Sequence, residues 1–382
     1  MVLACSSSSY GEAPPSVPDA AGIDGALTEA GPPGADATTS CEAAEDLAKD
    51  PRNCGKCGHS CEGGECTAGV CQPLELAQFT DEPVANVVVT KTHVFWNTMQ
   101  SLSAGPGNVY SCPKPSCAGK YTVLTKTTPI RGLGSDGDQR AFGGAFYSGG
   151  GLFQLAPAAV TPRLSVAEGG NPLQFSVRPD ALLYLSIFDV GGARSVHRWA
   201  YEGTVTVPCT FSTSETSAAA AFTASRVYLH TNGAGKLYPC PILGTDGSFE
   251  VFLANLYLDS LTATSDRVFW AVNGAVTSSP EGVTAQTLSG EIAVADVGSN
   301  VTSVTITGGE LFATTQGGQL WSCAPADCRG TLRKVAEDGI LETYHPLVSH
   351  TVAADDDSVY FVGVDSRSDA GAGTSRLMKV AR

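Results

Sequence analysis

Short apolar runs recur along most of the chain, and polar or glycine-rich turn residues precede each of them. In the clearest run, Ser265–Trp270, a branched apolar residue is followed directly by an aromatic residue. Similar pairs, with alanine or leucine sometimes in first place, occur at Val94-Phe95, Ala141-Phe142, Leu183-Tyr184, Val227-Tyr228, Leu311-Phe312 and Val359-Tyr360. Successive aromatic residues lie 47, 42, 44, 41, 43 and 48 positions apart. This period, built from short apolar runs, is typical of a β-propeller blade.

A full repeat contains four strand signals. In the fifth repeat they are Leu261–Thr264, Arg267–Val272, Ala275–Ser278 and Thr284–Leu288, with the hairpin pair Asn273-Gly274 between the second and third. Fourth strands are also expected at 163–167 and 249–253. First strands, such as 218–221, use small residues, as expected for strands crowded around a propeller axis.

The seventh repeat has no fourth strand before Arg382, but a matching segment, Leu74–Phe79, precedes the first repeat. We expect this segment to pair with the outer edge of the seventh repeat, because that pairing leaves no open seam in the ring. The sequence thus predicts an all-β fold, a seven-bladed propeller over residues 73–382 closed by an N-terminal strand. Six blades are the alternative, because Ala141-Phe142 lies in a weak strand.

Residues 41–72 contain six cysteines and few large apolar residues, so cross-links must replace a core. An even set favours three disulfides of undetermined connectivity among Cys41, Cys54, Cys57, Cys61, Cys66 and Cys71. Zinc is the alternative, since Cys54 and Cys57 have ligand spacing and His59 is near; we interpret His59 as a solvated loop residue. The string NCGKCGHSC resembles the repeat of Stig1-like secreted proteins, which implies a disulfide-stapled module without catalytic residues.

Six further cysteines lie within the repeats. Cys112 and Cys117, like Cys323 and Cys328, are five positions apart where a third strand turns into a fourth, so each pair is predicted to staple its own turn. By elimination, Cys209 pairs with Cys240.

Residues 1–40 are rich in serine, proline, glycine and alanine, which predicts a disordered tether. Its start, Val2-Leu3-Ala4-Cys5, resembles the lipobox of bacterial lipoproteins, which implies lipidation of Cys5. The resemblance places the protein in the outer membrane or outside the cell, with a lipid anchor as its only contact with a membrane; a chance cysteine in the tether is the alternative.

The formal net charge is −15, which argues against nucleic-acid partners. The second-strand strings VFW, VYF and VYL give residues 73–382 a resemblance to bacterial exported propellers of the broad YWTD, NHL or TolB-like kind. That resemblance implies a fold and no activity.

The sequence contains no catalytic or cofactor-binding motif that we recognise, so we expect neither catalytic residues nor a cofactor. The acidic runs Asp136–Asp138 and Asp355–Asp357 suggest calcium, but turn chemistry explains both because they lie between first and second strands. His93, His197 and His230, and the four tryptophans, are interpreted as packing residues.

Three connections between second and third strands are long: 97–107, 143–150 and 363–374. They belong to the first, second and seventh repeats, which ring closure makes neighbours, and the segments 128–134 and 340–349 are expected beside them. Such a rim predicts a binding surface; its expected contact residues are Met99, Arg131, Glu342, Tyr344, His345 and Arg367. Passive, variable loops are the alternative.

The leading functional hypothesis is a binding or scaffold propeller that recognises a protein or glycan through this rim. A hydrolase or lyase with a site on the central axis is the second hypothesis, and a structural envelope component is the third. The cysteine-rich module is expected on the face opposite the long loops.

Overall fold

The computed structural model describes residues 44–80, 82–99, 107–114, 117–126, 128–145, 151–165, 172–186, 194–201, 203–211, 218–231, 236–243, 260–272, 275–282, 295–296, 301–315, 318–336, 351–365 and 374–382. Contacts divide the chain into residues 1–40 and residues 41–382. The second unit joins the cysteine-rich module and the propeller, which the sequence analysis separates at residue 72. No helix in the described part is long and apolar enough to span a membrane.

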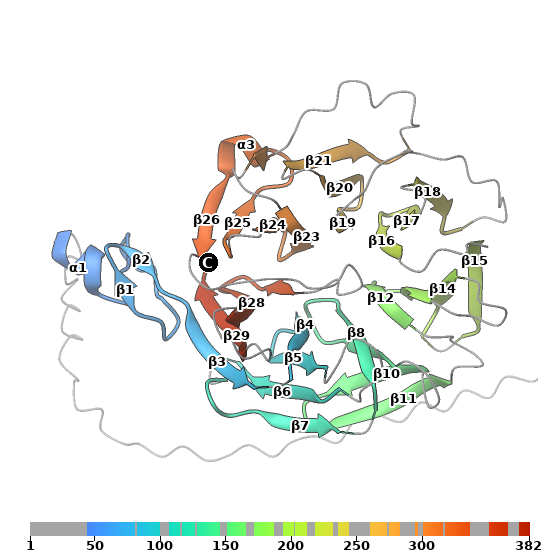
Figure 1. The fold of residues 1–382 in the computed structure, drawn as a ribbon, viewed down its shortest axis with the longest axis horizontal. Helices are drawn as coiled ribbons and strands as arrows, with labels where there is room; N and C mark the ends of the chain where they lie inside the picture. Colours follow the sequence, from blue (N-terminus) through green and yellow to red (C-terminus); the bar gives the residue numbers. More distant parts are fainter. Residues whose placement is uncertain are drawn as a thin grey trace, which may run out of the picture. The chain divides into compact units, whose positions relative to one another are not determined.

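Seven antiparallel sheets surround a common axis in this unit, as predicted (Figure 1). Their innermost strands contact one another in the order β27, β4, β8, β12, β16, β19 and β23, and β23 contacts β27 again. The described part of the chain therefore forms a closed, seven-bladed propeller.

The first three blades each contain four strands in the described ranges. Blade 1 consists of β4 (Val84–Val89), β5 (His93–Thr98), β6 (Val109–Pro113) and β7 (Thr122–Thr125); blade 2 of β8 (Ile130–Ser135), β9 (Ala141–Ala145), β10 (Gly151–Ala156) and β11 (Ala159–Ser165); blade 3 of β12 (Pro172–Val177), β13 (Leu182–Ser186), β14 (Arg194–Trp199) and β15 (Val205–Phe211).

The remaining blades follow the same order. Blade 4 consists, as described, of β16 (Ala218–Phe222), β17 (Arg226–Thr231) and β18 (Lys236–Pro241); blade 5 of β19 (Ser260–Ala263), β20 (Arg267–Val272), β21 (Ala275–Pro280) and β22 (Ala295–Asp296); blade 6 of β23 (Val301–Thr307), β24 (Glu310–Thr315), β25 (Leu320–Cys323) and β26 (Arg333–Ala336), with α3 (Cys328–Thr331) before β26; blade 7 of β27 (Val352–Ala354), β28 (Ser358–Asp365), β29 (Thr374–Ala381) and β3 (Leu74–Phe79). The cysteine-rich module contains α1 (Ala44–Lys49), β1 (Cys66–Thr67) and β2 (Val70–Cys71).

The repeated aromatic residue lies in the second strand of every blade. It is at most 2% exposed in each of them: Phe95, Phe142, Tyr184, Tyr228, Phe269, Phe312 and Tyr360. The period in the sequence is therefore the period at which the chain inserts one large ring into the core between neighbouring sheets.

Strand β3 closes the ring as predicted. It pairs antiparallel with β29, with Phe79 opposite Ser375 and Leu74 opposite Lys379. Its neighbour in the ring, blade 1, is also bonded to it, because the amide of Gly119 donates to the carbonyl of Leu76 at 3.1 Å. Nearly three hundred residues separate β3 from β29 in the sequence. Closure of the ring by this strand pair therefore depends on contacts between residues that are distant along the chain.

The weak strand of the second repeat has a tertiary cause. A methyl group on Gly132 would collide with the carbonyl oxygen of Leu173, and one on Gly144 with that of Pro172. Both carbonyls belong to the first two residues of β12. Blade 3 therefore lies too close to the backbone of blade 2 to leave room for a side chain at either glycine. Gly144, which weakens the pattern of β9, and Gly132 of the adjacent strand β8 let these blades approach.

Some predicted fourth strands differ from the structure. Segments 249–253 and 284–288 lie outside the described residues, as does the Asn273-Gly274 turn. The described outer strand of blade 5 is β22, which pairs through Ala275 and Val276 of β21. In blade 2 the outer strand begins at Ala159, earlier than predicted, because only two residues separate it from β10.

Candidate functional site

The clearest concave site in the described part of the protein is a cavity on the propeller axis, with a volume of about 680 Å³. Every innermost strand contributes to its wall, from Val87 in β4 around to Ala353 in β27. Turns between first and second strands also line it, at Asp136 and Asp356. The cavity therefore lies at the face of these turns, opposite the face at which the second strands end and the third strands begin.

The charged residues at this cavity come from blades 1, 2 and 7. Lys91 pairs with Asp138 at 2.9 Å, and both side chains are at least half exposed. Lys114 pairs with Asp355 at 2.7 Å, and both are largely buried. Because each pair joins two neighbouring blades, these ion pairs hold the turns together beside the cavity.

Lys91 lies among several carboxylates. The hydrogen bond to Asp138 raises the pKa of its ammonium group above the ordinary value, and the charges of Asp138, Asp356 and Asp136 act in the same direction. The lysine is thus held in its charged form while it is largely exposed to water.

The two acidic runs form turns, as the sequence analysis expects. One carboxylate oxygen of Asp136 accepts hydrogen bonds from the amides of Asp138, Gln139 and Arg140 at 2.9–3.0 Å. Asp355 accepts from the amides of Asp357 and Ser358 at 3.0 and 2.8 Å. Aspartate is favoured in such turns because it can accept from amides of its own turn.

The predicted rim residues are only partly described. Met99 is 8% exposed, and its amide donates to the carbonyl of Pro83, so its side chain offers little surface to a partner in this structure. Arg131 lies in β8, the innermost strand of blade 2, and not in a connecting loop. Glu342, Tyr344, His345 and Arg367 lie outside the described residues.

Histidines and tryptophans in the strands pack against neighbours. His197 stacks on Tyr184 with ring centroids 5.0 Å apart, and His230 is 1% exposed. Trp96 is fully buried and stacks on Tyr110, which also contacts Phe79 of the closing strand. These side chains pack between neighbouring strands and blades.

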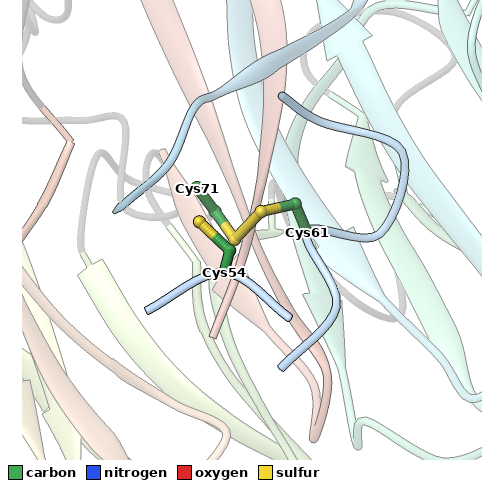
Figure 2. A group of neighbouring side chains, drawn as sticks. All are labelled: Cys54, Cys61 and Cys71. Atoms are coloured by element: carbon green, nitrogen blue, oxygen red, sulfur yellow. A yellow bond between two sulfur atoms is a disulfide. The ribbon is translucent and has the colours of Figure 1, made fainter. Parts of the chain in front are cut away.

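The cysteine-rich module is cross-linked by Cys54–Cys66 and Cys61–Cys71, and Cys57 is also disulfide-bonded. Cys5 and Cys41 lie outside the described residues. The sulfur atoms of Cys54, Cys61 and Cys71 lie within 4.8 Å of one another (Figure 2). Zinc binds thiolates, whereas these sulfurs are joined in disulfides, so the structure favours the disulfide interpretation over the zinc alternative.

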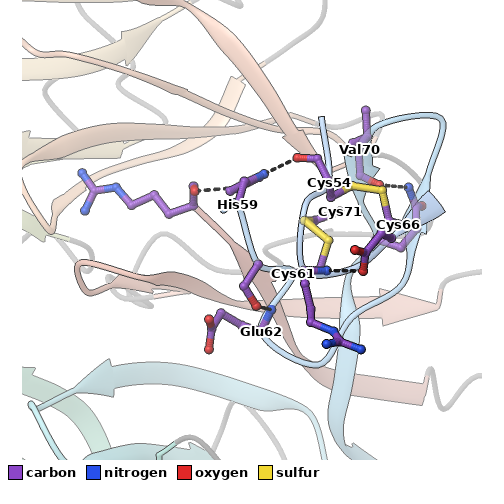
Figure 3. Close-up of a disulfide and its surroundings, with 12 residues drawn as sticks. Cys54, His59, Cys61, Glu62, Cys66, Val70 and Cys71 are labelled. Atoms are coloured by element: carbon purple, nitrogen blue, oxygen red, sulfur yellow. Dashed lines mark hydrogen bonds between the residues drawn. A yellow bond between two sulfur atoms is a disulfide. The ribbon is translucent and has the colours of Figure 1, made fainter. Parts of the chain in front are cut away.

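The module docks on the end of blade 7. His59 lies between two carbonyl oxygens, with Nδ1 2.6 Å from that of Cys54 and Nε2 3.1 Å from that of Arg382 (Figure 3). It is half-buried there, so its interpretation as a solvated residue is wrong.

Lys379 makes the second link between module and propeller. Its ammonium group donates to the carbonyl of Glu62 at 3.2 Å and lies 3.9 Å from the Glu62 carboxylate. Burial lowers the pKa of Lys379, against the charge of Glu62. The module cysteines also share one apolar cluster with Leu76 and Ala381. Module and closing strand therefore form one continuous contact.

The propeller cysteines pair in the manner that the sequence analysis expects. Cys112–Cys117 and Cys323–Cys328 each close a turn within one blade. Cys209–Cys240 joins β15 of blade 3 to β18 of blade 4, with the Cα atoms 6.4 Å apart.

Comparisons with known proteins identify a fold. No protein-family model and no curated protein sequence matches the chain. Among solved structures, YCF48 bound to D1 peptide has a TM-score of 0.55 at 8% identity, covering 81% of this chain and 94% of that chain. The WD40 propeller domain of Doa1 has a TM-score of 0.50 at 12% identity, covering 80% and 96%.

A puromycin-hydrolysing peptidase from Mycobacterium tuberculosis has a TM-score of 0.51 at 11% identity, and the match covers 78% of this chain and 52% of the peptidase. Proteins with this fold thus include a peptide-bound protein and a hydrolase. The likeness shows a β-propeller, and function must be argued from the site.

Proposed function

We propose that the protein is a binding propeller that recognises a protein or glycan, and that the axial cavity is one of its recognition sites. The observation that carries this proposal is the chemistry of the cavity wall. The innermost strands contribute aliphatic, aromatic, hydroxyl and amide side chains, such as Val87, Phe222, Thr262 and Gln174. None of the described histidines or cysteines belongs to the wall. The wall offers shape, hydrogen bonds and charge to a ligand.

The size of the cavity supports binding. Pockets that hold small ligands or short segments of a partner span about 300–1,000 Å³, and this cavity is within that range. The long loops of blades 1, 2 and 7 would offer a second surface on the opposite face.

An exported location is part of the proposal. Cross-links in both the module and the propeller are typical of oxidising compartments. A lipid on Cys5 would hold the protein at a membrane through the tether.

Filling the cavity tests the proposal. Ser176 lines it from β12, and Ser176→Trp adds a bulky side chain there. Thr161→Trp on the exposed outer strand β11 is the matched control. The full chain and both variants would be screened against peptide and glycan arrays, and against ester, glycoside and peptide substrates.

We expect saturable binding to at least one array member, lost in Ser176→Trp and kept in Thr161→Trp, at equal thermal midpoints. Turnover of a substrate that Ser176→Trp abolishes would instead identify an enzyme. Binding that neither variant changes would remove the cavity from the proposal.

A further inference from the structure

The axial cavity is charged on one side only. Its charged wall residues are five aspartates and two lysines, all from blades 1, 2 and 7: Asp136, Asp138, Asp355, Asp356, Asp357, Lys91 and Lys114. Blades 3 to 6 contribute only uncharged residues, among them Phe175, Phe222, Leu261 and Thr305. The wall therefore has an acidic arc facing a neutral, partly apolar arc.

The acidic arc retains an excess of three negative charges after its lysines are counted. Lys91 and Lys114 are each paired with one carboxylate, Asp138 and Asp355. Asp136 accepts from amides of its own turn, which leaves its negative charge in place. Asp356 and Asp357 are exposed at the turn of blade 7. A ligand with positive charge would complement this arc.

The spacing of the carboxylates favours an organic cation over a metal ion. Among the described residues, the only set of three potential metal ligands within 4.8 Å of one another is the cysteine group of the module. The aspartates of the arc are thus spread over two turns, one in blade 2 and one in blade 7, and no three of them lie close enough together to hold one ion. A guanidinium or ammonium group on a longer chain can reach dispersed carboxylates, and its aliphatic stem can lie on apolar surface.

We propose that the axial cavity binds a basic segment of a partner protein, with arginine or lysine side chains directed to the acidic arc and apolar side chains against Val177, Phe222 and Ile306, which line the cavity and are only half-buried. This inference rests on the proposed function and names the class of ligand. The negative charge of the arc favours a basic ligand. The apolar residues on the opposite side favour a peptide, which has apolar side chains, over a free amine. The Asp356 and Asp357 carboxylates are the residues that select the cation.

The test uses the full chain and fluorescein-labelled octapeptides that alternate leucine with arginine, glutamine or glutamate, read by fluorescence polarisation. The variant is Asp356→Asn with Asp357→Asn. Its control is Asp180→Asn with Asp266→Asn, which removes two charges from turns of the same type in blades 3 and 5 that do not line the cavity. Both doubles have the same net charge.

We expect the arginine peptide to bind at least tenfold more tightly than the glutamine peptide, and the glutamate peptide not to bind. The Asp356/Asp357 double should weaken binding of the arginine peptide at least tenfold, and the Asp180/Asp266 double less than twofold. Equal weakening by both doubles would show a general charge effect and overturn the inference. Displacement of the peptide by spermidine or calcium at equal concentration would overturn it as well.

The design separates this inference from the proposed function. If the glutamine or glutamate peptide binds as well as the arginine peptide and Ser176→Trp abolishes that binding, the cavity is a recognition site and only its preference for basic segments is wrong. If no peptide and no glycan binds, the proposed function fails first.

Discussion

Gly144 shows how one residue can serve the contact between two blades. It lies in β9, the second strand of blade 2, where a Cβ atom would collide with the carbonyl of Pro172 and approach Phe175. Gly363 occupies β28, the second strand of blade 7, but there the nearest atom to such a Cβ is 3.6 Å away. The neighbouring sheet therefore approaches Gly144 closely, whereas the atoms nearest to Gly363 belong to its own sheet.

We predict that Gly144→Ala destabilises the protein by about 1–3 kcal/mol or more, because backbone atoms of β12 must move. Gly363→Ala should change stability by less than about 1 kcal/mol and could raise it by restricting the unfolded chain. Urea unfolding of both variants beside the parent measures the difference. Equal midpoints for the two variants would contradict the close approach of blades 2 and 3.

For single residues, the sequence predicts which aromatic side chains are buried better than it predicts which way a side chain after a strand points. The aromatic repeat identifies seven buried rings because burial of large apolar side chains leaves a period in the sequence. Met99 follows a strand whose loop is long, yet its side chain turns into the core. Which way a side chain points after a strand depends on tertiary contacts, and a loop length contains no information about it.

The three propeller disulfides are predicted completely by the sequence, because spacing and place in the repeat constrain them, whereas the pairing within the cysteine-rich module is left open. Cys209–Cys240 connects neighbouring blades across 31 residues, whereas Cys112–Cys117 spans 5 residues within one turn. A longer loop loses more conformational freedom in the unfolded state when it is closed.

Replacing both cysteines of a pair by alanine should therefore have unequal effects. On the chain-entropy model, loss of Cys209–Cys240 costs about 3.5 kcal/mol and loss of Cys112–Cys117 about 2 kcal/mol. Unfolding in urea without reductant gives both free energies. A larger loss for the short turn would show that native-state contacts, rather than loop closure, dominate.

The acidic arc is a feature at the scale of elements, and the sequence analysis explains its two acidic runs by turn chemistry alone. Asp136 and Asp355 do form turns, but blades 2 and 7 flank blade 1, so these turns meet beside Lys91. The two acidic turns lie near each other because ring closure places blade 7 next to blade 1.

For the whole molecule, closure of the ring by β3 is the contact on which the fold depends. The same strand leads directly from the module, which binds Lys379 and Arg382 at the end of β29. Leu76 is 1% exposed in β3, while Gln78, two residues later, is exposed. The strand thus offers a buried and an exposed position for the same substitution.

Leu76→Asp should destabilise the protein by more than about 4 kcal/mol, because it buries an unpaired charge at the seam. Gln78→Asp should change stability by no more than about 0.5 kcal/mol, as is usual at an exposed position. Urea midpoints and the radius of gyration from X-ray scattering measure the two variants. A compact, fully stable Leu76→Asp protein would mean that the ring holds without this strand.

The antiparallel pairing of β3 with β29 also defines a second way to connect the chain. Lys379 faces Leu74, so the end of β29 lies beside the start of β3. A short linker from Arg382 to Leu74, in place of residues 1–73, would turn blade 7 into one uninterrupted meander of four strands, and new termini could then be opened between two other blades. In such a circular permutant the ring would be closed covalently, and the chain would fold without the contact between the cysteine-rich module and Lys379.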